Sequence, residues 1–343
     1  MHFRLSAVLF CEYSGFAAWW CEACFMLPVE LSAAIADLTA EIPRADLARA
    51  VAELSSQYRA KGRARPQLTT PHRAAYLASR LPATYAVISR VLREAQLRIP
   101  GLCVESMLDL GAGPGTAMWA AVELFPDLLR VVGMEDSAEW IEIGNRLMSK
   151  SGNRAIRNAE WRQGTVTGEF PPQSFDLVVA SYLMNEVPVT DRARVALAAW
   201  QRTKRVLVII EPGTPEGFAI IRSLREELLA AGAYLAAPCP HANECPIPAG
   251  DWCHFSKRLE RTSEHRDTKR GELGYEDEKY SYVILSREPV ALPAARILRH
   301  PRKHSGHTEF ELCTPEGLKR ETISRKQGQR YKTAKKAEWG DTL

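Results

Sequence analysis

The stretch SMLDLGAGPGTAMWAAVEL, residues 106–124, decides the fold of this chain. It is an apolar strand, then a glycine-rich loop, then a helix rich in alanine. The loop carries Asp109, Gly111, Gly113 and Gly115. Glycines let the backbone approach a ligand closely, and the helix that follows offers its N-terminus to that ligand. We therefore predict the first strand–loop–helix unit of an α/β domain that binds a ligand at this loop.

The identity of the ligand follows from the form of the loop. A second strand ends at Glu135, about 20 residues on, where a carboxylate reaches ribose hydroxyls. A dinucleotide site needs G-x-G-x-x-G, whereas this loop is G-A-G-P-G, and no lysine follows it as in a P-loop. The loop with its leading Asp109 resembles the S-adenosylmethionine site of doubly wound methyltransferases. Asp109, the three loop glycines and Glu135 are therefore our predicted cofactor-binding residues.

Two later segments extend this resemblance. SFDLVVASYLMNEVP (residues 174–188) and RVLVIIEPGTPEGF (residues 205–218) resemble the fourth and fifth strands of the same fold, each with the loop that follows it. Strands that alternate with helices predict a mostly parallel sheet covered on both faces. The predicted fold class is α/β, a Rossmann-like S-adenosylmethionine methyltransferase fold with an N-terminal helical region and a small, β-rich, basic C-terminal extension.

The sequence leaves catalysis open, because a fold does not determine a function. The loop at residues 181–186 lacks the N-P-P-Y or D-P-P-Y signature of amino-group methylases, and no Pro-Cys pair ends a strand. Glu186 is either a base or a carboxylate that caps the next helix. We assign no catalytic residue.

The regions before the α/β core differ in character. Residues 1–25 are rich in apolar and aromatic side chains, but Glu12 and Glu22 interrupt them, and their apolar run is short for a secretory signal. We treat them as an uncertain leader, with Met26 as an alternative start. Residues 26–102 show helical spacing of apolar side chains and predict a helical region. The methyltransferase-like domain then covers residues 103–290.

Four cysteines in the C-terminal half, spaced C-x5-C-x7-C-x59-C, indicate a metal site. They are Cys239, Cys245, Cys253 and Cys313. Four thiolates complete an iron–sulfur cubane, whereas structural zinc usually takes paired C-x2-4-C knuckles. The spacing therefore favours a four-iron four-sulfur cluster, with the first three ligands on an inserted loop at residues 238–254.

Two alternatives to the cluster remain open. His241, His254 and His265 are rival ligands, so a mixed Cys/His zinc site is possible. Free cysteines are also often simply buried. Cys103, just before the first strand, is expected to be inert.

Positive charge is concentrated in the predicted C-terminal extension, residues 291–343. Between residues 296 and 336 there are twelve Lys and Arg and four Glu, a net charge of +8 in a chain whose total is +4. This imbalance indicates contact with RNA phosphates, although a solvated basic tail is the simpler alternative. Tyr331 and Trp339 are candidate stacking or packing partners. The basic segment at residues 253–270 predicts a helix that forms a second contact face.

Composition limits the compartment and the partners. The hydrophobic fraction of 46% and the charged fraction of 25% are ordinary for a globular protein. Eight cysteines, unevenly placed in 343 residues, are too few for a secreted disulfide scaffold. We predict a cytoplasmic location, no membrane partner, and a monomer when the protein is not bound to the ribosome.

The chain resembles the methyltransferase-like family of small-ribosomal-subunit assembly factors, known in mitochondria and in bacteria. The motifs that carry the resemblance cover most of residues 70–343: LDLGAGPGT, IIEPGTPEGF, APCPH-x3-CP, DWCHFSKRLER, LGYEDEKYSYVIL and GHTEFELCTPEG leading to KKAEWGD. Members pair a Rossmann-like domain with a four-iron four-sulfur cluster held by four cysteines. This resemblance implies that the ligands are Cys239, Cys245, Cys253 and Cys313.

The resemblance also implies a role. It predicts an assembly factor that binds the RNA of the maturing small ribosomal subunit. One alternative is an active S-adenosylmethionine-dependent methyltransferase that modifies ribosomal RNA. A second is a redox or iron sensor that regulates ribosome assembly.

Overall fold

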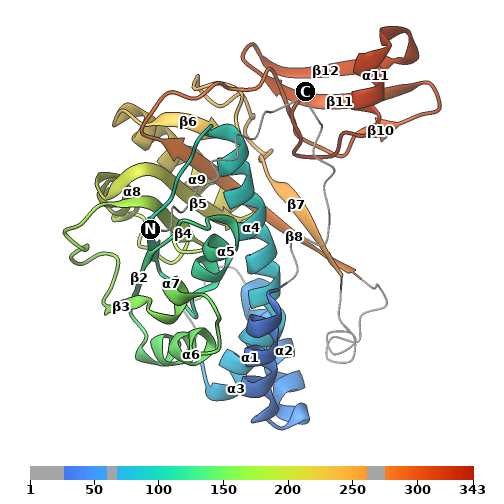
Figure 1. Cartoon of the computed structure of the whole chain (residues 1–343). Helices are drawn as coiled ribbons and strands as arrows, with labels where there is room; N and C mark the ends of the chain where they lie inside the picture. The colour runs from blue at the N-terminus through green and yellow to red at the C-terminus, as the bar shows by residue number, and fades with distance from the viewer. Residues whose placement is uncertain (1–26, 60–67, 261–274) are drawn as a thin grey trace, which may run out of the picture.

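The computed structural model describes residues 27–59, 68–260 and 275–343 (Figure 1). The predicted leader at residues 1–25 and the alternative start Met26 lie outside the described residues. The remainder forms a large sheet between two layers of helices, with a second, smaller sheet at the C-terminal end.

The helices predicted before the core are present. They are α1 (Val29–Ala40), α2 (Arg44–Arg59), α3 (Thr70–Ser79) and α4 (Leu81–Arg98). Prolines stand at the first turns of α3 and α4, where the missing N–H costs nothing. Helix α4 is buried over most of its length and runs from α3 towards the second sheet. None of the helices in the described ranges is both long and apolar enough to cross a bilayer.

The large sheet confirms the predicted α/β fold. Its strands are β1 (Ser106–Leu110), β2 (Arg130–Glu135), β3 (Glu160–Gln163), β4 (Phe175–Ser181), β5 (Thr203–Pro212), β6 (Tyr234–Ala237), β7 (Phe255–Glu260) and β8 (Tyr275–Ser286). The strand order is β3-β2-β1-β4-β5-β8-β6, and β7 also pairs with β8. The first five strands are parallel, and β8 lies antiparallel to β5. The predicted mostly parallel sheet is therefore correct for β1 to β5.

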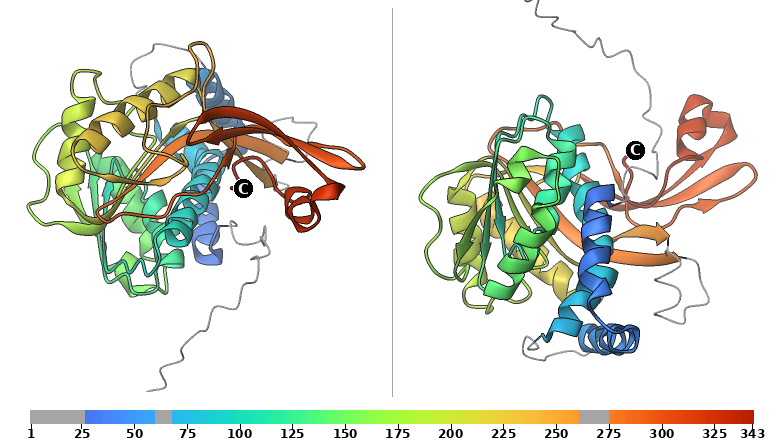
Figure 2. Two further views of the ribbon diagram at one scale, coloured as in Figure 1. Left: turned by 90° about the horizontal axis from the view of Figure 1, so that it is seen from above. Right: turned by 60° about the horizontal axis from the view of Figure 1, so that its bottom comes forward.

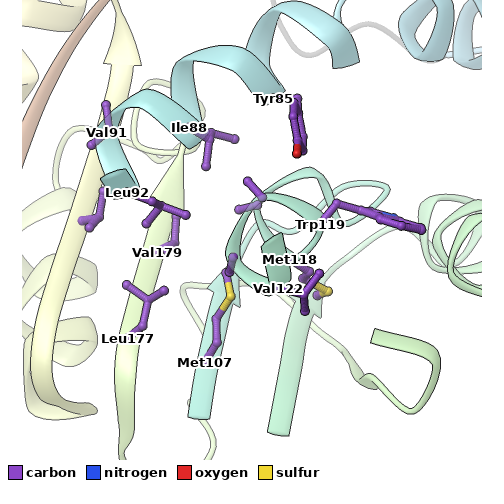
Figure 3. Close-up of a cluster of buried hydrophobic side chains, with 14 of the residues drawn as sticks. Tyr85, Ile88, Val91, Leu92, Met107, Met118, Trp119, Val122, Leu177 and Val179 are labelled. Carbon is purple, nitrogen blue, oxygen red and sulfur yellow. The ribbon is translucent and has the colours of Figure 1, made fainter. Parts of the chain in front are cut away.

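Helices cover both faces of this sheet, as its apolar strands require. They are α5 (Thr116–Leu124), α6 (Ala138–Met148), α7 (Arg154–Arg157), α8 (Arg192–Gln201) and α9 (Pro215–Ala230). Successive strand residues point to opposite faces, so Val206 and Val208 belong to the core beneath α4 and α5. Leu207 and Ile209 belong to the core beneath α8 and α9. Figure 3 shows the first of these cores, where Val91 and Leu92 of α4 lie over the strands.

The C-terminal extension contains the predicted short strands. Its elements are β9 (Arg296–Ile297), β10 (Arg302–Lys303), β11 (His307–Thr314), β12 (Gly317–Ser324), the short 3-10 helix η2 (Arg325–Gln327) and α11 (Gln329–Ala334). The four strands form a separate sheet, which projects from the large one (Figure 2). Phe310, Leu312, Ile323 and Tyr331 form a small core of its own.

The helix predicted for residues 253–270 is wrong where it can be seen. Residues Phe255–Glu260 form β7, which pairs antiparallel with the first half of β8. The Arg258 guanidinium bonds across this pair to the Asp277 carboxylate at 2.9 and 3.1 Å. Cross-strand pairing with the next strand therefore outweighs the local preference of this charged stretch. Residues 261–270 lie outside the described residues.

A buried ion pair joins three distant parts of the chain. Arg296 is one of the twelve basic residues predicted to contact RNA, but its side chain is only 2% exposed. Its guanidinium donates to the Glu94 carboxylate of α4 at 2.5 Å, to the Pro238 carbonyl at 2.7 Å and to the Gly340 carbonyl at 2.6 Å. The Tyr282 hydroxyl donates to the second oxygen of Glu94 at 2.8 Å. Arg296 thus has a structural role.

We predict that Arg296→Met strongly destabilises the protein. The substitution leaves the Glu94 carboxylate buried without its main cation, and breaking a buried pair costs about 3–5 kcal/mol. Chemical denaturation measures the free energy of unfolding, with the exposed Arg320→Met as the matched control. The double variant Arg296→Met/Glu94→Leu should recover part of the loss. Equal stability of Arg296→Met and Arg320→Met would refute the role of the pair.

Candidate functional site

The glycine loop after β1 has the backbone that its glycines permit. Gly111, Gly113 and Gly115 have φ angles of +63°, +53° and +85°, in the left-handed region that favours glycine. A Cβ on Gly111 would lie 2.6 Å from Cδ1 of Leu183, so the loop and the segment after β4 are in close contact. Helix α5 begins directly after Gly115.

Asp109, which leads this loop, is an unpaired buried acid. Its side chain is 1% exposed at the carboxyl end of β1, and neither carboxylate oxygen has a hydrogen-bond partner. Burial raises the pKa of Asp109 well above its usual value, and the nearby Glu135 raises it further. A buried polar group without a partner is costly, which is consistent with a group that meets a polar ligand.

Glu135, at the end of β2, already holds the loop in place. One carboxylate oxygen accepts from the Gly113 amide at 2.8 Å, and the other accepts from the Ser137 amide at 3.0 Å. Burial raises the pKa of Glu135, while these two amides act in the opposite direction. The structure therefore brings Glu135 to the predicted loop, with its oxygens engaged by backbone amides.

A cavity opens beside Gly111 and Glu135, whereas Asp109, Gly113 and Gly115 do not line it. Gly111, Glu135, Asp136, Thr165 and Leu183 help to line it, and its volume is about 240 Å³ including open solvent. The residues present suit S-adenosylmethionine in their chemistry, with a close backbone approach and a carboxylate near the loop.

The segment after β4 forms one wall of this cavity and depends on a buried acid that sequence reasoning missed. Glu211, at the end of β5, accepts a hydrogen bond from the Met184 amide at 2.7 Å and is 0% exposed. Burial raises the pKa of Glu211 to about 8, although backbone hydrogen bonds oppose the rise. The sequence does contain a signal for this residue, because the carboxylate of Glu211 directly follows the apolar run RVLVII.

The same segment contains Tyr182 and Glu186, whose positions test whether it carries a catalytic group. Tyr182 has a φ of +56°, the only positive φ of a non-glycine residue among the described residues. Such strained backbone is often found at functional sites. Glu186 does not cap the next helix, because the N-cap of α8 is Asp191. The structure assigns no catalytic role to either residue.

The four predicted metal ligands are brought together. Strands β6 and β7 both pair with the same edge of β8, and the loop between them carries three of the cysteines. The fourth comes from β11 of the second sheet. Cys239, Cys245, Cys253 and Cys313 line one cavity of about 610 Å³ including open solvent. The site thus lies where the inserted loop meets the second sheet.

The three rival histidines differ in their positions. His241 lies inside the cavity, with Nε2 3.5 Å from Sγ of Cys313. His254 stacks on Trp252, with ring centroids 5.2 Å apart, and meets Trp339 edge-on at 4.9 Å. His265 lies outside the described residues. Of the two that are described, only His241 lines the cavity.

Burial favours the protonated form of the thiols that line this cavity. Burial raises the pKa of Cys253 well above its usual value and that of Cys313 to about 12, and neighbouring cysteines add to both shifts. Burial also raises the pKa of Cys239, whereas Arg225 and Arg296 lower it. Metal ligation requires thiolates. A bound metal centre would supply the positive charge that four neighbouring thiolates need.

Arg225 is a second site residue that sequence reasoning missed. It is a buried side chain of α9, and its guanidinium donates to the carbonyls of His241 and Asn243 at 2.8 and 2.9 Å. It therefore fixes the backbone of the cysteine loop. Its signal is an arginine between Leu224 and Leu228 on the apolar face of a helix.

Most of the C-terminal basic side chains are exposed, but the aromatic ones are not. Of the twelve Lys and Arg between residues 296 and 336, only Arg296 and Arg299 are not exposed, and Arg299 bonds to Asp251 at 2.6 Å. Tyr331 is buried in the small core, and Trp339 is half-buried between His254 and His300. Of the two roles predicted for these aromatic residues, the structure shows packing.

Comparison with known proteins adds the following findings. The sequence profile of a family described as "Mitochondrial small ribosomal subunit Rsm22" matches residues 71–343. The human "Ribosome assembly protein METTL17, mitochondrial" is 29% identical over an alignment of 287 residues that covers 78% of this chain and 61% of the relative. The yeast (Saccharomyces cerevisiae) "Ribosome assembly protein RSM22, mitochondrial" is 21% identical over 81% of this chain and 68% of its own length. The chain thus spans less than two thirds of the human relative.

A solved structure is also similar. Magnesium protoporphyrin IX methyltransferase from Synechocystis, with bound SAH, aligns with a TM-score of 0.39 and 11% identity, over 69% of this chain and 94% of that one.

The predicted cytoplasmic location is contradicted by these comparisons. The matching family is described as mitochondrial, and both curated relatives carry the word mitochondrial in their names. Cysteine usage excludes a secreted disulfide scaffold, but it does not distinguish one reducing compartment from another.

We predict a specific pH dependence from Glu211. Since its pKa rises from 4.5 unfolded to about 8 folded, the folded state binds the proton more tightly across this window. The stability that this group contributes is therefore lost as pH rises towards 8, by about 1.4 kcal/mol per pH unit. Denaturation of the wild type and of Glu211→Gln at several pH values measures the free energy of unfolding of each protein. The value for the wild type should fall relative to that for Glu211→Gln as pH rises. A difference that stays constant with pH would contradict the prediction.

Proposed function

The chain belongs to the mitochondrial small ribosomal subunit Rsm22 family, and from that membership we propose that it is an rRNA-binding assembly factor of the small ribosomal subunit. In this proposal it carries a four-iron four-sulfur cluster on a methyltransferase-like fold. The observation that carries the proposal is the convergence of four cysteines where the large sheet meets the basic second sheet.

The cluster would be held by the four cysteines and would link two units of the chain. Three ligands lie between β6 and β7, and Cys313 lies on β11 opposite Arg296 of β9. The cavity shared by the four cysteines and the nearby guanidiniums of Arg225 and Arg296 support a cluster with four thiolates. Its contribution would be structural, because it would fasten residues 291–343 to the methyltransferase-like unit at residues 103–290.

S-adenosylmethionine would bind at the loop after β1. We propose that Gly111, Gly113 and Gly115 allow the close backbone approach, and that Asp109 and Glu135 meet its polar groups. The unpartnered oxygens of Asp109 support this assignment. The cofactor is a methyl donor, but we propose binding alone, because no residue near the loop is identified as a catalytic base.

RNA would bind the exposed basic side chains of the second sheet and of the segment after it. Several of these cations already pair with acids, as Arg320 does with Glu311 and Arg330 with Glu321. Among the described residues, Lys326, Lys332 and Lys335 are exposed and form no ion pair. These three lysines are therefore the side chains most available to phosphates.

The first test of the proposal is metal analysis of Cys313→Ser. The wild-type chain, purified without oxygen, should contain about four irons and four sulfides, with broad visible absorbance. Cys313→Ser should lose most of the iron, because it removes the ligand supplied by the second sheet. Cys103→Ser is the matched control, since Cys103 lies outside the cavity, with Sγ 3.9 Å from an oxygen of Asp127. One zinc and no iron in the wild type and in the control would refute the cluster.

The second test concerns RNA. The triple variant Lys326→Gln/Lys332→Gln/Lys335→Gln should bind small-subunit RNA more weakly. Its log affinity should also fall less steeply with log salt concentration, by about 2 in the slope. Fluorescence anisotropy over a series of salt concentrations measures both quantities. The control variant Arg44→Gln/Lys150→Gln/Lys204→Gln removes the same charge from exposed positions outside the extension. Equal slopes for the two variants would show that Lys326, Lys332 and Lys335 do not contact RNA.

A further inference from the structure

The turn between β10 and β11 places two histidines side by side. Lys303 pairs with Thr308, and the His304 amide donates to the His307 carbonyl at 2.9 Å, which closes a two-residue turn at Ser305 and Gly306. Residues directly opposite in an antiparallel pair point to the same face. The rings of the two histidines accordingly stack, with centroids 4.5 Å apart and an angle of 17° between the planes.

A carboxylate completes the group. Glu309 lies two residues after His307 on β11, so its side chain points to the same face. Its Oε1 is 3.5 Å from Nε2 of His307 and 4.0 Å from Nε2 of His304. All three potential ligand atoms lie within 4.8 Å of one another, which holds for no other three Cys, His or acidic side chains among the described residues.

The turn is held from behind. The Arg325 amide donates to the Gly306 carbonyl at 3.0 Å, and the Arg325 guanidinium donates to the Ser305 carbonyl. These bonds tie the turn to the end of β12, so the two histidines need little ordering to act together. The guanidinium of Arg302 also lies on this face, but it is 4.0 Å from the other oxygen of Glu309, Oε2, which is a long contact. It leaves Oε1 directed at the imidazoles.

We propose that His304, His307 and Glu309 form a binding site for a divalent transition-metal ion such as zinc. Two imidazoles and one carboxylate are ligands that zinc takes readily at about 2.0–2.2 Å, and three protein ligands leave a position for water. The present separations of 3.5 and 4.0 Å need only a small movement of exposed side chains to reach such a geometry. This site is separate from the cysteine cavity and does not depend on the proposed function.

The test is titration of the full chain with zinc and with cobalt. The wild type should bind one more zinc than the double variant His304→Gln/His307→Gln, as measured by calorimetry. Glu309→Gln should weaken binding at this site by at least about tenfold, because even loss of an outer partner costs about 10–100-fold. Glu311→Gln is the matched control, since it removes a neighbouring acid from the same strand without touching the group.

Cobalt separates this site from the cysteines. Thiolate-bound cobalt absorbs strongly in the near ultraviolet, whereas cobalt bound by nitrogen and oxygen gives only weak visible bands. The weak bands should disappear in His304→Gln/His307→Gln and persist in Cys313→Ser. Zinc should also shift the ring resonances of His304 and His307 in the wild type, a measurement that does not depend on the stability of any variant. Unchanged resonances, or equal zinc binding by the wild type and the double variant, would overturn the proposal.

Discussion

The contact between Arg296 and Glu94 is the constraint on which the arrangement of this molecule depends. Both groups are buried, and a buried charge is tolerated only when it is paired and hydrogen-bonded. The guanidinium satisfies this requirement by using three segments at once: α4, the start of the cysteine loop at Pro238, and the chain end at Gly340. Since Arg296 also lies opposite Cys313 in the second sheet, the position of the fourth cysteine is coupled to that of the N-terminal helices.

Strand β8 provides the second constraint, because it is long enough to serve three neighbours. One edge pairs with β5, and the other pairs with β6 near Ser286 and with β7 near Tyr280. The loop between β6 and β7 must therefore leave the sheet and return to the same edge. This path concentrates Cys239, Cys245 and Cys253 in a small volume beside the second sheet. The Ser281 hydroxyl, which donates to the Cys253 carbonyl at 2.8 Å, helps to hold the returning end.

The parts that could be predicted are those with short-range patterns. The strand–loop–helix unit around Gly111 and the apolar strand that ends at Glu211 follow from alternation, glycine placement and helical spacing. The prediction failed for Phe255–Glu260, because its charged residues carry no strong local pattern and its partner strand follows a long intervening segment. It also misjudged Arg296, which was counted with the exposed cations. Local sequence does not reveal that a cation has a carboxylate partner 202 residues away.

The sequence by itself determined the α/β class, the glycine loop and the set of four cysteines, because each is written in residue types at fixed local spacing. The tertiary structure alone decided that the cysteines share one cavity, that Arg225 and Arg296 lie beside them, and that His304, His307 and Glu309 face one another. The physical reason is that these contacts depend on which strand edges pair and which charges are buried. Such choices are made by the free energy of the whole packed chain, and no short segment contains them.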